Sequence, residues 1–243
     1  MFEQEKTNET AALSGAAAKL KHAMSFGSAG KYESALMSIE EALTLQENYT
    51  DAWLLKGAIL VKQGWCSKAL ICFEKFIEFN PNSVAVWHLK GATLVTLDRN
   101  EEAVECFRKA VALDPDNLEL HLTLASSLRR QRRFEDALNC YKDMLSLRPH
   151  DARIHYLIGI MLGNMGTYER ALGSFATALR LKPDFTDAIL GKATVLAKLG
   201  RIDEAKRCAQ LALETRSENE TGKPTDVDLA DVPPQPEFEE PQI

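Results

Sequence analysis

Cysteine thiols are the first side chains in this sequence that could do chemistry, because a thiolate can bind a metal or attack an electrophile. There are five, namely Cys66, Cys72, Cys106, Cys140 and Cys208. No two form a Cys-x-x-Cys pair, and an odd number does not make a disulfide framework, so a reducing compartment fits best. Cys72, Cys106 and Cys140 follow one another at steps of 34 residues, and Cys208 lies two steps further on. Equivalent sites on packed helices lie about 8–10 Å apart or more, so we expect packing positions and no metal site.

Histidines are the next candidates for chemistry. His121 and His155 also lie 34 residues apart, and two steps back along the chain the same positions hold Trp53 and Trp87. We therefore expect these imidazoles to fill a tryptophan site rather than to bind a metal. The sequence contains no nucleophile elbow, phosphate-binding loop, HExxH motif or dinucleotide-binding glycine pattern. We expect no catalytic residues, no cofactor and no enzymatic activity.

Four arginines make the one concentrated basic feature, and they are Arg129, Arg130, Arg132 and Arg133. They could form a solvated turn or an anionic docking site. The chain carries a candidate ligand of its own, because residues 217–243 hold eight acidic residues against one lysine. A flexible segment of this length spans on the order of 30 Å, and tethering would raise its effective concentration to about the millimolar range. The acidic tail could therefore occlude a binding surface or exchange between chains.

The elements that position these residues follow from an internal repeat. Alanine recurs at an unbroken step of 34 residues at Ala35, Ala69, Ala103, Ala137, Ala171 and Ala205. A proline column of the same period contains Pro81, Pro115, Pro149 and Pro183. A third column holds Ile39, Phe73, Phe107, Tyr141 and Phe175. A fixed period of this length is typical of an array of stacked structural repeats.

Each repeat reads as two helices joined by a short turn. Between Thr50 and Ser83 the apolar residues recur twice at helical spacing, Gly64 interrupts them, and Asn80-Pro81 ends the second run. Glycine recurs in this turn at Gly30, Gly64, Gly166 and Gly200, where a tight link between helices needs backbone freedom. The small alanine lets the two helices of a repeat approach closely, because a larger side chain would overpack the site.

These residues resemble the tetratricopeptide repeat. The matching positions in one repeat are Trp53, Gly57, Ala69, Phe73, Phe76 and Pro81, and in the next they are Trp87, Gly91, Ala103, Phe107, Ala110 and Pro115. The resemblance implies an all-α, right-handed α-solenoid of antiparallel helix pairs. It covers six repeats, at residues 16–49, 50–83, 84–117, 118–151, 152–185 and 186–219, after an N-terminal extension (1–15) and before an acidic, proline-containing tail (220–243). Lys56, Lys90 and Lys192 depart from the usual leucine, but a lysine stem can lie on apolar surface while its amine reaches water.

In the resembled family, residues of the first helix of each repeat line a concave groove that takes a peptide or a helix. By helix register, the groove candidates here are Leu54, Ala58, His88, Ala92, Val95, Leu122, Ser126, Arg129, Tyr156, Ile160, Asn164, Leu190, Thr194 and Lys198. Such grooves often carry a Lys, Asn and Arg clamp for chaperone tails. The sites that would carry it hold Leu20, Met24, Leu55, Ala85 and Leu89, so an apolar groove for aliphatic or aromatic anchors is expected instead.

Bulk properties limit the possible functions further. The net charge of −6 disfavours nucleic-acid binding, and no run of residues is apolar enough to span a membrane. The acidic start, from Met1 to Glu9, lacks the apolar stretch of a signal peptide, so a cytoplasmic protein is expected. The last repeat carries Lys206, Ala209 and Thr215 where earlier repeats have larger apolar residues, which favours a self-capping end.

The sequence thus predicts a protein–protein interaction scaffold or adaptor whose partner is an unidentified protein or peptide. An alternative is a regulatory or assembly subunit of an enzyme or chaperone complex. A third class, RNA binding, would need basic and stacking residues along the groove, and these are absent outside the arginine cluster. Self-association through the terminal repeats or the tail is also open.

Overall fold

The computed structural model describes residues 2–221, with side chains from residue 13 to residue 216. The described residues form twelve α-helices and no strand. The chain divides into two compact units, Met1–Leu120 and His121–Ile243, which are described separately. The predicted acidic tail lies outside the described residues from residue 222 onward, and α12 includes its first two residues.

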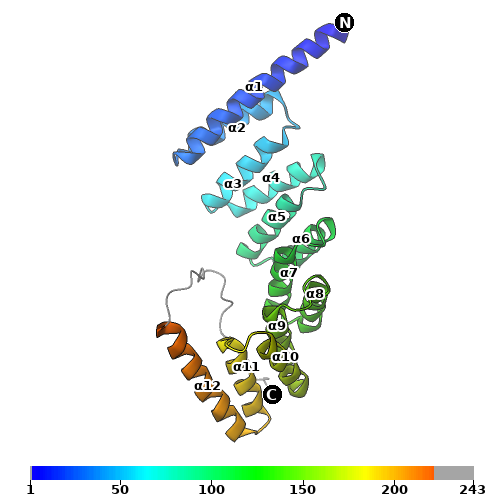
Figure 1. Cartoon of the computed structure of the whole chain (residues 1–243). Helices are drawn as coiled ribbons and strands as arrows, with labels where there is room; N and C mark the ends of the chain where they lie inside the picture. Colours follow the sequence, from blue (N-terminus) through cyan, green and yellow to red (C-terminus); the bar gives the residue numbers. More distant parts are fainter. Residues whose placement is uncertain (1, 222–243) are drawn as a thin grey trace. The chain divides into compact units, whose positions relative to one another are not determined.

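The N-terminal unit consists of helix pairs (Figure 1). Its helices are α1 (Phe2–Ser28), α2 (Tyr32–Leu45), α3 (Thr50–Lys62), α4 (Cys66–Phe79), α5 (Val84–Thr96) and α6 (Asn100–Leu113). The closest packing joins α1 to α2, α3 to α4, and α5 to α6, while α2 packs on α3 and α4 packs on α5. Helix α1 runs through residue 16 without a break and is about twice as long as α3 or α5.

The C-terminal unit continues the same plan. Helix α7 (Leu118–Arg130) begins at the end of the first unit, and α8 (Phe134–Leu147), α9 (Ala152–Asn164), α10 (Tyr168–Leu181), α11 (Thr186–Lys198) and α12 (Ile202–Thr221) follow. Here α9 pairs with α10 and α11 pairs with α12, while α8 packs on α9 and α10 packs on α11. The chain is therefore an all-α repeat solenoid, as the sequence predicts.

The turn inside each repeat depends on a left-handed residue. Gly30, Gly64, Gly166 and Gly200 all have φ between +72° and +79°. The two remaining repeats have no glycine at this position, and Asp98 and Arg132 adopt φ of +58° instead. The predicted role of the turn glycines is confirmed, and the turn geometry persists even where a residue with a side chain must adopt it.

The core of each repeat is built from a small residue facing a large one. The alanine column is buried throughout, as expected for the closest approach of two helices. In the second repeat, a Cβ added to Gly57 would lie 2.5 Å from Cε1 of Phe73, so the glycine makes room for the ring. Gly159 and Gly191 face Phe175 in the same way, with distances of 2.7 Å each. The phenylalanine rings therefore require glycines on the neighbouring helices.

Lysines at two departures from the leucine pattern connect neighbouring repeats. Lys56 on α3 pairs with Glu40 on α2 at 2.7 Å, and Lys90 on α5 pairs with Glu74 on α4 at 3.0 Å. Their amines also lie over Trp53 and Trp87, at 5.0 and 5.9 Å from the ring centroids. The side chains thus lie along the repeat surface while the amines reach solvent-facing carboxylates, as the sequence suggests.

The described helices also bear on two questions raised by the sequence. None of them is both long enough and apolar enough to cross a membrane. At the end of the array, Lys206 and Ala209 on α12 are exposed and Thr215 is buried. The outer side of α12 is not wholly polar, because Leu213 is 64% exposed.

Candidate partner-binding surfaces

The first helix of each repeat in the N-terminal unit carries a run of accessible apolar residues. Among the predicted groove residues, Leu54, Ala58, His88 and Val95 are half-buried and Ala92 is exposed. Met24 on α1 and Leu89 on α5 are also exposed, at 58% and 38%. Met24, Ala58 and Ala92 stand at the same repeat position, and Leu89 lies one turn before Ala92 on α5. We call Met24, Leu54, Ala58, Leu89 and Ala92 the apolar strip.

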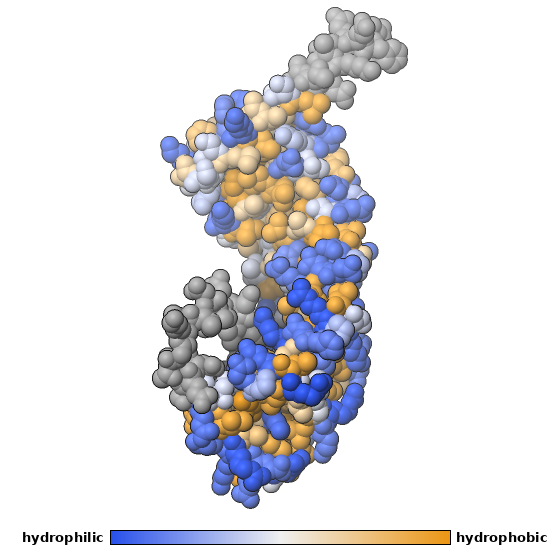
Figure 2. All heavy atoms as spheres, in the orientation of Figure 1, coloured by the Kyte–Doolittle hydropathy of each residue, from blue (hydrophilic) through white to orange (hydrophobic). Residues whose placement is uncertain are grey.

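Two members of the strip were not among the predicted groove residues. In the sequence, Met24 and Leu89 stand out only as positions that lack a charged clamp. The 34-residue register already places Met24 in line with Ala58 and Ala92, so the signal was present in the sequence. In Figure 2 apolar side chains gather over the region of α3, α4 and α5 in this unit.

His88 is held against the core beside the strip. Its ring lies 5.6 Å from the ring of Phe107, with the planes tilted by 51°. This contact holds the imidazole against a core residue, and His88 as a whole is half-buried.

In the C-terminal unit the predicted groove residues differ widely in exposure. Tyr156 and Ile160 on α9 are each only 6% exposed. The Tyr156 ring lies 5.0 Å from the ring of Phe185 and 6.1 Å from that of Phe175, so it packs inside the array. The accessible candidates on α7 and α11 are Ser126, Leu190 and Lys198, with Leu122, Asn164 and Thr194 half-buried. This surface is more polar than the apolar strip.

Arg129 brings a positive charge to two buried phenols of the C-terminal unit. The pKa of Tyr156 is raised to about 12, mainly by burial and also by the nearby Asp187, while Arg129 opposes both effects. Burial likewise raises the pKa of Tyr141 to about 12, again against the influence of Arg129. Both phenols are therefore neutral at physiological pH.

The arginine cluster lies at the end of α7 and in the turn before α8. Arg133 is engaged within the turn, because its Nε donates to Oδ2 of Asp136 at 2.9 Å. Arg129 is half-buried, whereas Arg130 and Arg132 are exposed. The cluster therefore contains both a structural arginine and accessible ones, and its anionic docking role stays a prediction.

The tryptophan site has a structural function. The indole Nε1 of Trp53 donates to the backbone oxygen of Glu47 at 2.8 Å, and that of Trp87 donates to the backbone oxygen of Pro81 at 2.8 Å. His155 places Nε2 3.3 Å from the backbone oxygen of Pro149. The imidazole thus reaches the same turn carbonyl as the indole, which confirms that His155 fills the tryptophan site.

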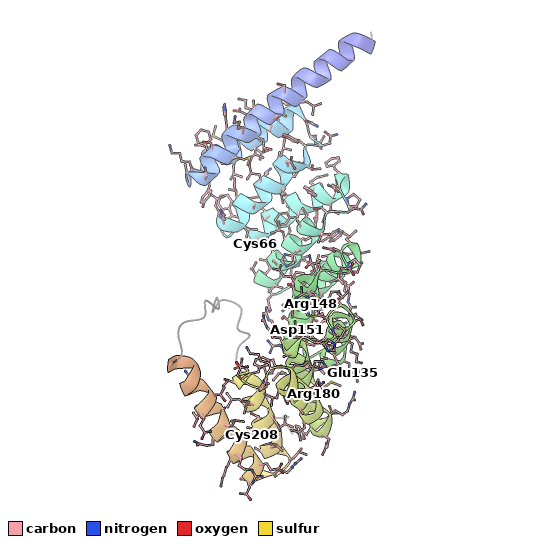
Figure 3. All side chains as sticks on the ribbon, viewed as in Figure 1. Cys66, Glu135, Arg148, Asp151, Arg180 and Cys208 are labelled. Carbon is pink, nitrogen blue, oxygen red and sulfur yellow. The ribbon has the colours of Figure 1, made fainter. Side chains whose placement is uncertain are left out.

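The cysteines take the positions expected for packing residues. All five thiols are free, and Cys72, Cys106 and Cys140 are buried. Burial raises the pKa of the Cys72 thiol to about 11 and also raises that of Cys106. Cys66 at the start of α4 and Cys208 on α12 are half-buried (Figure 3). Among the described residues, no three His, Cys, Asp or Glu side chains are grouped so as to hold a metal ion.

Asp151 stabilises the start of α9, whereas α3, α5 and α11 begin without a side-chain cap. Its side chain caps α9 by accepting a hydrogen bond from the backbone nitrogen of Arg153 at 2.8 Å (Figure 3). This bond satisfies one of the free N–H groups of the first helical turn. It anchors the end of α9 that lies nearest to His155.

Comparisons with solved structures agree with this architecture. MamA is 22% identical, with a TM-score of 0.61 over 74% of this chain and 98% of that chain. YrrB, described as a TPR protein with an unusual peptide-binding site, is 19% identical, with a TM-score of 0.58 over 75% of this chain and 94% of that chain. MamA from Desulfovibrio magneticus RS-1 is 17% identical, with a TM-score of 0.59 over 71% and 97%. At these identities the likeness concerns the fold alone.

Family models give a more direct comparison. No curated protein matches the chain. A model described as tetratricopeptide repeat matches residues 94–160 and 165–220, and a second model of the same description matches residues 50–83. These matches cover more than half of the sequence and fall in the helical repeats from α3 to α12. The chain therefore belongs to the tetratricopeptide repeat family.

Proposed function

We propose that this chain is a protein-interaction scaffold that binds a peptide or a helix of a partner protein across the first helices of its repeats. The observation that carries the proposal is the apolar strip of the N-terminal unit, where Met24 and Leu89 are exposed beside smaller apolar residues. Burying a leucine or methionine side chain stabilises a complex by about 1.5–3 kcal/mol. A partner with two or three aliphatic or aromatic anchors therefore suits this surface.

The composition of the apolar strip suits several apolar peptide segments better than a single peptide with a charged C-terminus. Methionine is flexible and polarizable, so Met24 can adapt to side chains of different shapes. Small residues at Ala58 and Ala92 leave room for the backbone or the side chains of a bound segment. The solved structure of YrrB is described as having a peptide-binding site, which is a property of that protein and agrees with this use of the fold.

Peptide selection with matched variants tests the proposal. Peptides are selected from a displayed random library on the intact chain, and their affinities are measured by fluorescence anisotropy. Met24→Gln and Leu89→Gln should each weaken binding by about tenfold, which corresponds to about 1.4 kcal/mol. Both side chains are accessible, so neither change should unfold the protein.

The controls are two exposed apolar residues on second helices. Met37 on α2 and Ile71 on α4 are 67% and 59% exposed, which is at least as accessible as the strip. Met37→Gln and Ile71→Gln should leave the affinity of the selected peptides unchanged. If all four variants bind equally well, or if only the control variants lose binding, the strip is not the partner site.

The alternative of a regulatory or assembly subunit uses the same surface, so the same variants examine it. In that case the partner captured through the strip is a component of an enzyme or chaperone complex. We expect the scaffold to have no catalytic activity of its own. Occlusion of the binding surface by residues 220–243 is tested by repeating the anisotropy measurement on a chain without these residues.

A further inference from the structure

A pocket of about 340 Å³ lies in the C-terminal unit among α8, α9 and α10. Its apolar floor is formed by Leu138, Ile158 and Leu162. Lys142, His155 and Arg170 line it together with Gly173 and the hydroxyl residues Ser174 and Thr177, and no carboxylate of the described residues lines it. We call this the α8–α10 pocket. It combines a lysine and an arginine side chain with an apolar floor.

The cations of the α8–α10 pocket have no carboxylate partner among the described residues. Within the described residues Lys142 donates only to the amide oxygen of Asn139, at 3.3 Å. Arg170 lies one turn before Ser174 on α10 and forms no ion pair within the described part of the chain. The Ser174 and Thr177 hydroxyls donate to backbone oxygens of Arg170 and Gly173, so their lone pairs face outward without adding negative charge.

The same place in the N-terminal unit is occupied by an ion pair. Between α4 and α5, Lys90 holds the carboxylate of Glu74 at 3.0 Å beside Trp87. The residues at these repeat positions in the pocket are Ile158, Lys142 and His155. A lysine thus stands at the repeat position of the Glu74 carboxylate, and an isoleucine stands at the position of Lys90.

Small residues on α10 open the pocket further. Gly173 stands where α6 has Glu105 and α4 has Ile71, and Ser174 stands where both have cysteine. A Cβ added to Gly173 would meet no atom within 4 Å, so the space next to this residue is open. The smaller ring of His155 in place of tryptophan leaves additional room above Ile158.

We propose that the α8–α10 pocket binds an aspartate or glutamate side chain of a partner protein that also presents a neighbouring aliphatic residue. The carboxylate lies between Lys142 and Arg170, as the Glu74 carboxylate lies on Lys90 in the earlier repeat. The aliphatic side chain covers the floor of Leu138 and Leu162. This site involves the second helices of two repeats, so it is independent of the apolar strip on α1, α3 and α5 and goes beyond the function proposed above.

The contact is expected to be weak and sensitive to salt. Accessible ion pairs contribute little each, since water and salt screen them. The pocket offers two cations to one carboxylate and a small apolar contact. Such a contact can support a larger interface, but it is too small to hold a complex together alone. A short acidic peptide should therefore bind measurably at low salt and lose most of its affinity at about 0.5 M salt.

The test uses the intact chain, labelled with ¹⁵N, and two synthetic peptides. The probe has the sequence of residues 225–232, in which three aspartates lie next to aliphatic residues, and its control carries asparagine in place of Asp226, Asp228 and Asp231. The probe should shift the backbone amide signals of Gly173, Ser174 and Thr177, and the control peptide should not. Equal shifts with both peptides would contradict a carboxylate site.

Variants at matched repeat positions locate the site. Lys142→Gln combined with Arg170→Gln should weaken probe binding by about fivefold or more. The control combines Arg108→Gln and Lys68→Gln, which occupy the same two repeat positions on α6 and α4, and it should leave binding unchanged. An equal loss in both double variants would mean that the probe responds to overall charge, and the proposal would fail.

A variant that fills the pocket and keeps its stability separates loss of the site from misfolding. Gly173→Glu places a carboxylate of the chain itself beside Arg170, where α6 has Glu105. The variant should keep the stability of the parent chain and lose the probe. If Gly173→Glu binds the probe as the parent does, the pocket is not the site, and the peptides selected on the apolar strip remain unaffected either way.

A last arm separates a partner from the chain's own acidic segment. Asp226, Asp228, Asp231, Glu237, Glu239 and Glu240 are neutralised together in the intact chain. Unchanged probe affinity supports a carboxylate supplied by a partner. Tighter binding of the probe by the neutralised chain would overturn that source and assign the pocket to the chain's own residues.

Discussion

The Cys72 side chain is a packing group rather than a nucleophile, because it is buried on α4 and its pKa is raised to about 11, chiefly by that burial. The thiolate is the reactive form, so the raised pKa keeps the thiol protonated and slow at neutral pH. At pH 8 the thiolate fraction is about 100-fold smaller than for a thiol whose pKa is about 9. Its reactivity should rise with pH until about pH 11.

Alkylation with iodoacetamide, followed by peptide mass spectrometry, measures this difference. Cys66 and Cys208 are half-buried and should be modified well before Cys72 in the native protein. The raised pKa also predicts the sign of a stability change. The unfolded chain loses the thiol proton first, so the free energy of unfolding should fall between about pH 9 and pH 11. Modification of Cys72 as fast as Cys66 at pH 8 would contradict the packing role.

Gly57 is a residue whose side chain must be absent. A Cβ at this position would lie 2.5 Å from Cε1 of Phe73, and the ring is fully buried and cannot move aside. Gly57→Ala should therefore lower the free energy of unfolding by about 1–3 kcal/mol, although alanine favours helix by about 1 kcal/mol. Gly173→Ala, which meets no atom, should instead raise it by about 0.5–1 kcal/mol.

Urea unfolding of both variants checks this prediction, and the chain supplies a rescue experiment. The first repeat has Ala23 and Ile39 at the positions of Gly57 and Phe73. The double variant Gly57→Ala with Phe73→Ile should recover part of the stability lost in Gly57→Ala alone. A Gly57→Ala chain that is as stable as the parent would mean that the ring can shift.

At the scale of the element, the turn between two helices depends on a single left-handed residue. Arg132 has a φ of +58° at the position where four other repeats have glycine. This conformation costs a residue with a side chain about 1–2 kcal/mol, and glycine avoids the steric part of that cost. Arg132→Gly should raise the free energy of unfolding by about 1 kcal/mol, and the reciprocal Gly166→Arg should lower it by about 1–2 kcal/mol.

Thermal unfolding followed by circular dichroism measures both changes. Arg132→Gly also removes one exposed cation of the arginine cluster, so binding of an acidic peptide to the same variant shows whether that cluster is used. If Arg132→Gly destabilises the protein, the arginine side chain contributes more to the turn than its backbone strain costs.

Helices and turns were predictable from the sequence because their signals repeat. The turn glycines and the alanine column occur at fixed steps, and each step gives the same local geometry. The exposure of single groove residues was not predictable in this way. Tyr156 was predicted to line the groove, yet it packs against Phe185, a residue of the following turn whose contact no column reveals. The pocket beside Lys142 depends on which neighbours are small, and this is a property of three helices together.

At the scale of the whole molecule, the position of a repeat in the array determines how much its contacts contribute to the free energy of unfolding. Repeats in a solenoid contact mainly their neighbours, and no helix follows α12 within the described residues. Leu43 on α2 and Leu213 on α12 occupy the same repeat position, but they are 7% and 64% exposed. Leu43 packs in a cluster with Ala52 and Ile59 of the following repeat, whereas α12 is the last described helix.

The same substitution should therefore have different effects at the two ends. Leu43→Ala should lower the free energy of unfolding by about 2–5 kcal/mol, because it leaves a cavity between two repeats, while Leu213→Ala should change it by about 0.5 kcal/mol or less. Native-state hydrogen exchange resolves the result by helix, since Leu43→Ala should speed exchange in α2 and α3, whereas Leu213→Ala should leave α11 unchanged. A large loss of stability from Leu213→Ala would show that the exposed side of α12 is covered in solution. A fall in molecular mass of the same variant, measured by light scattering, would show that a second copy of the chain covers it.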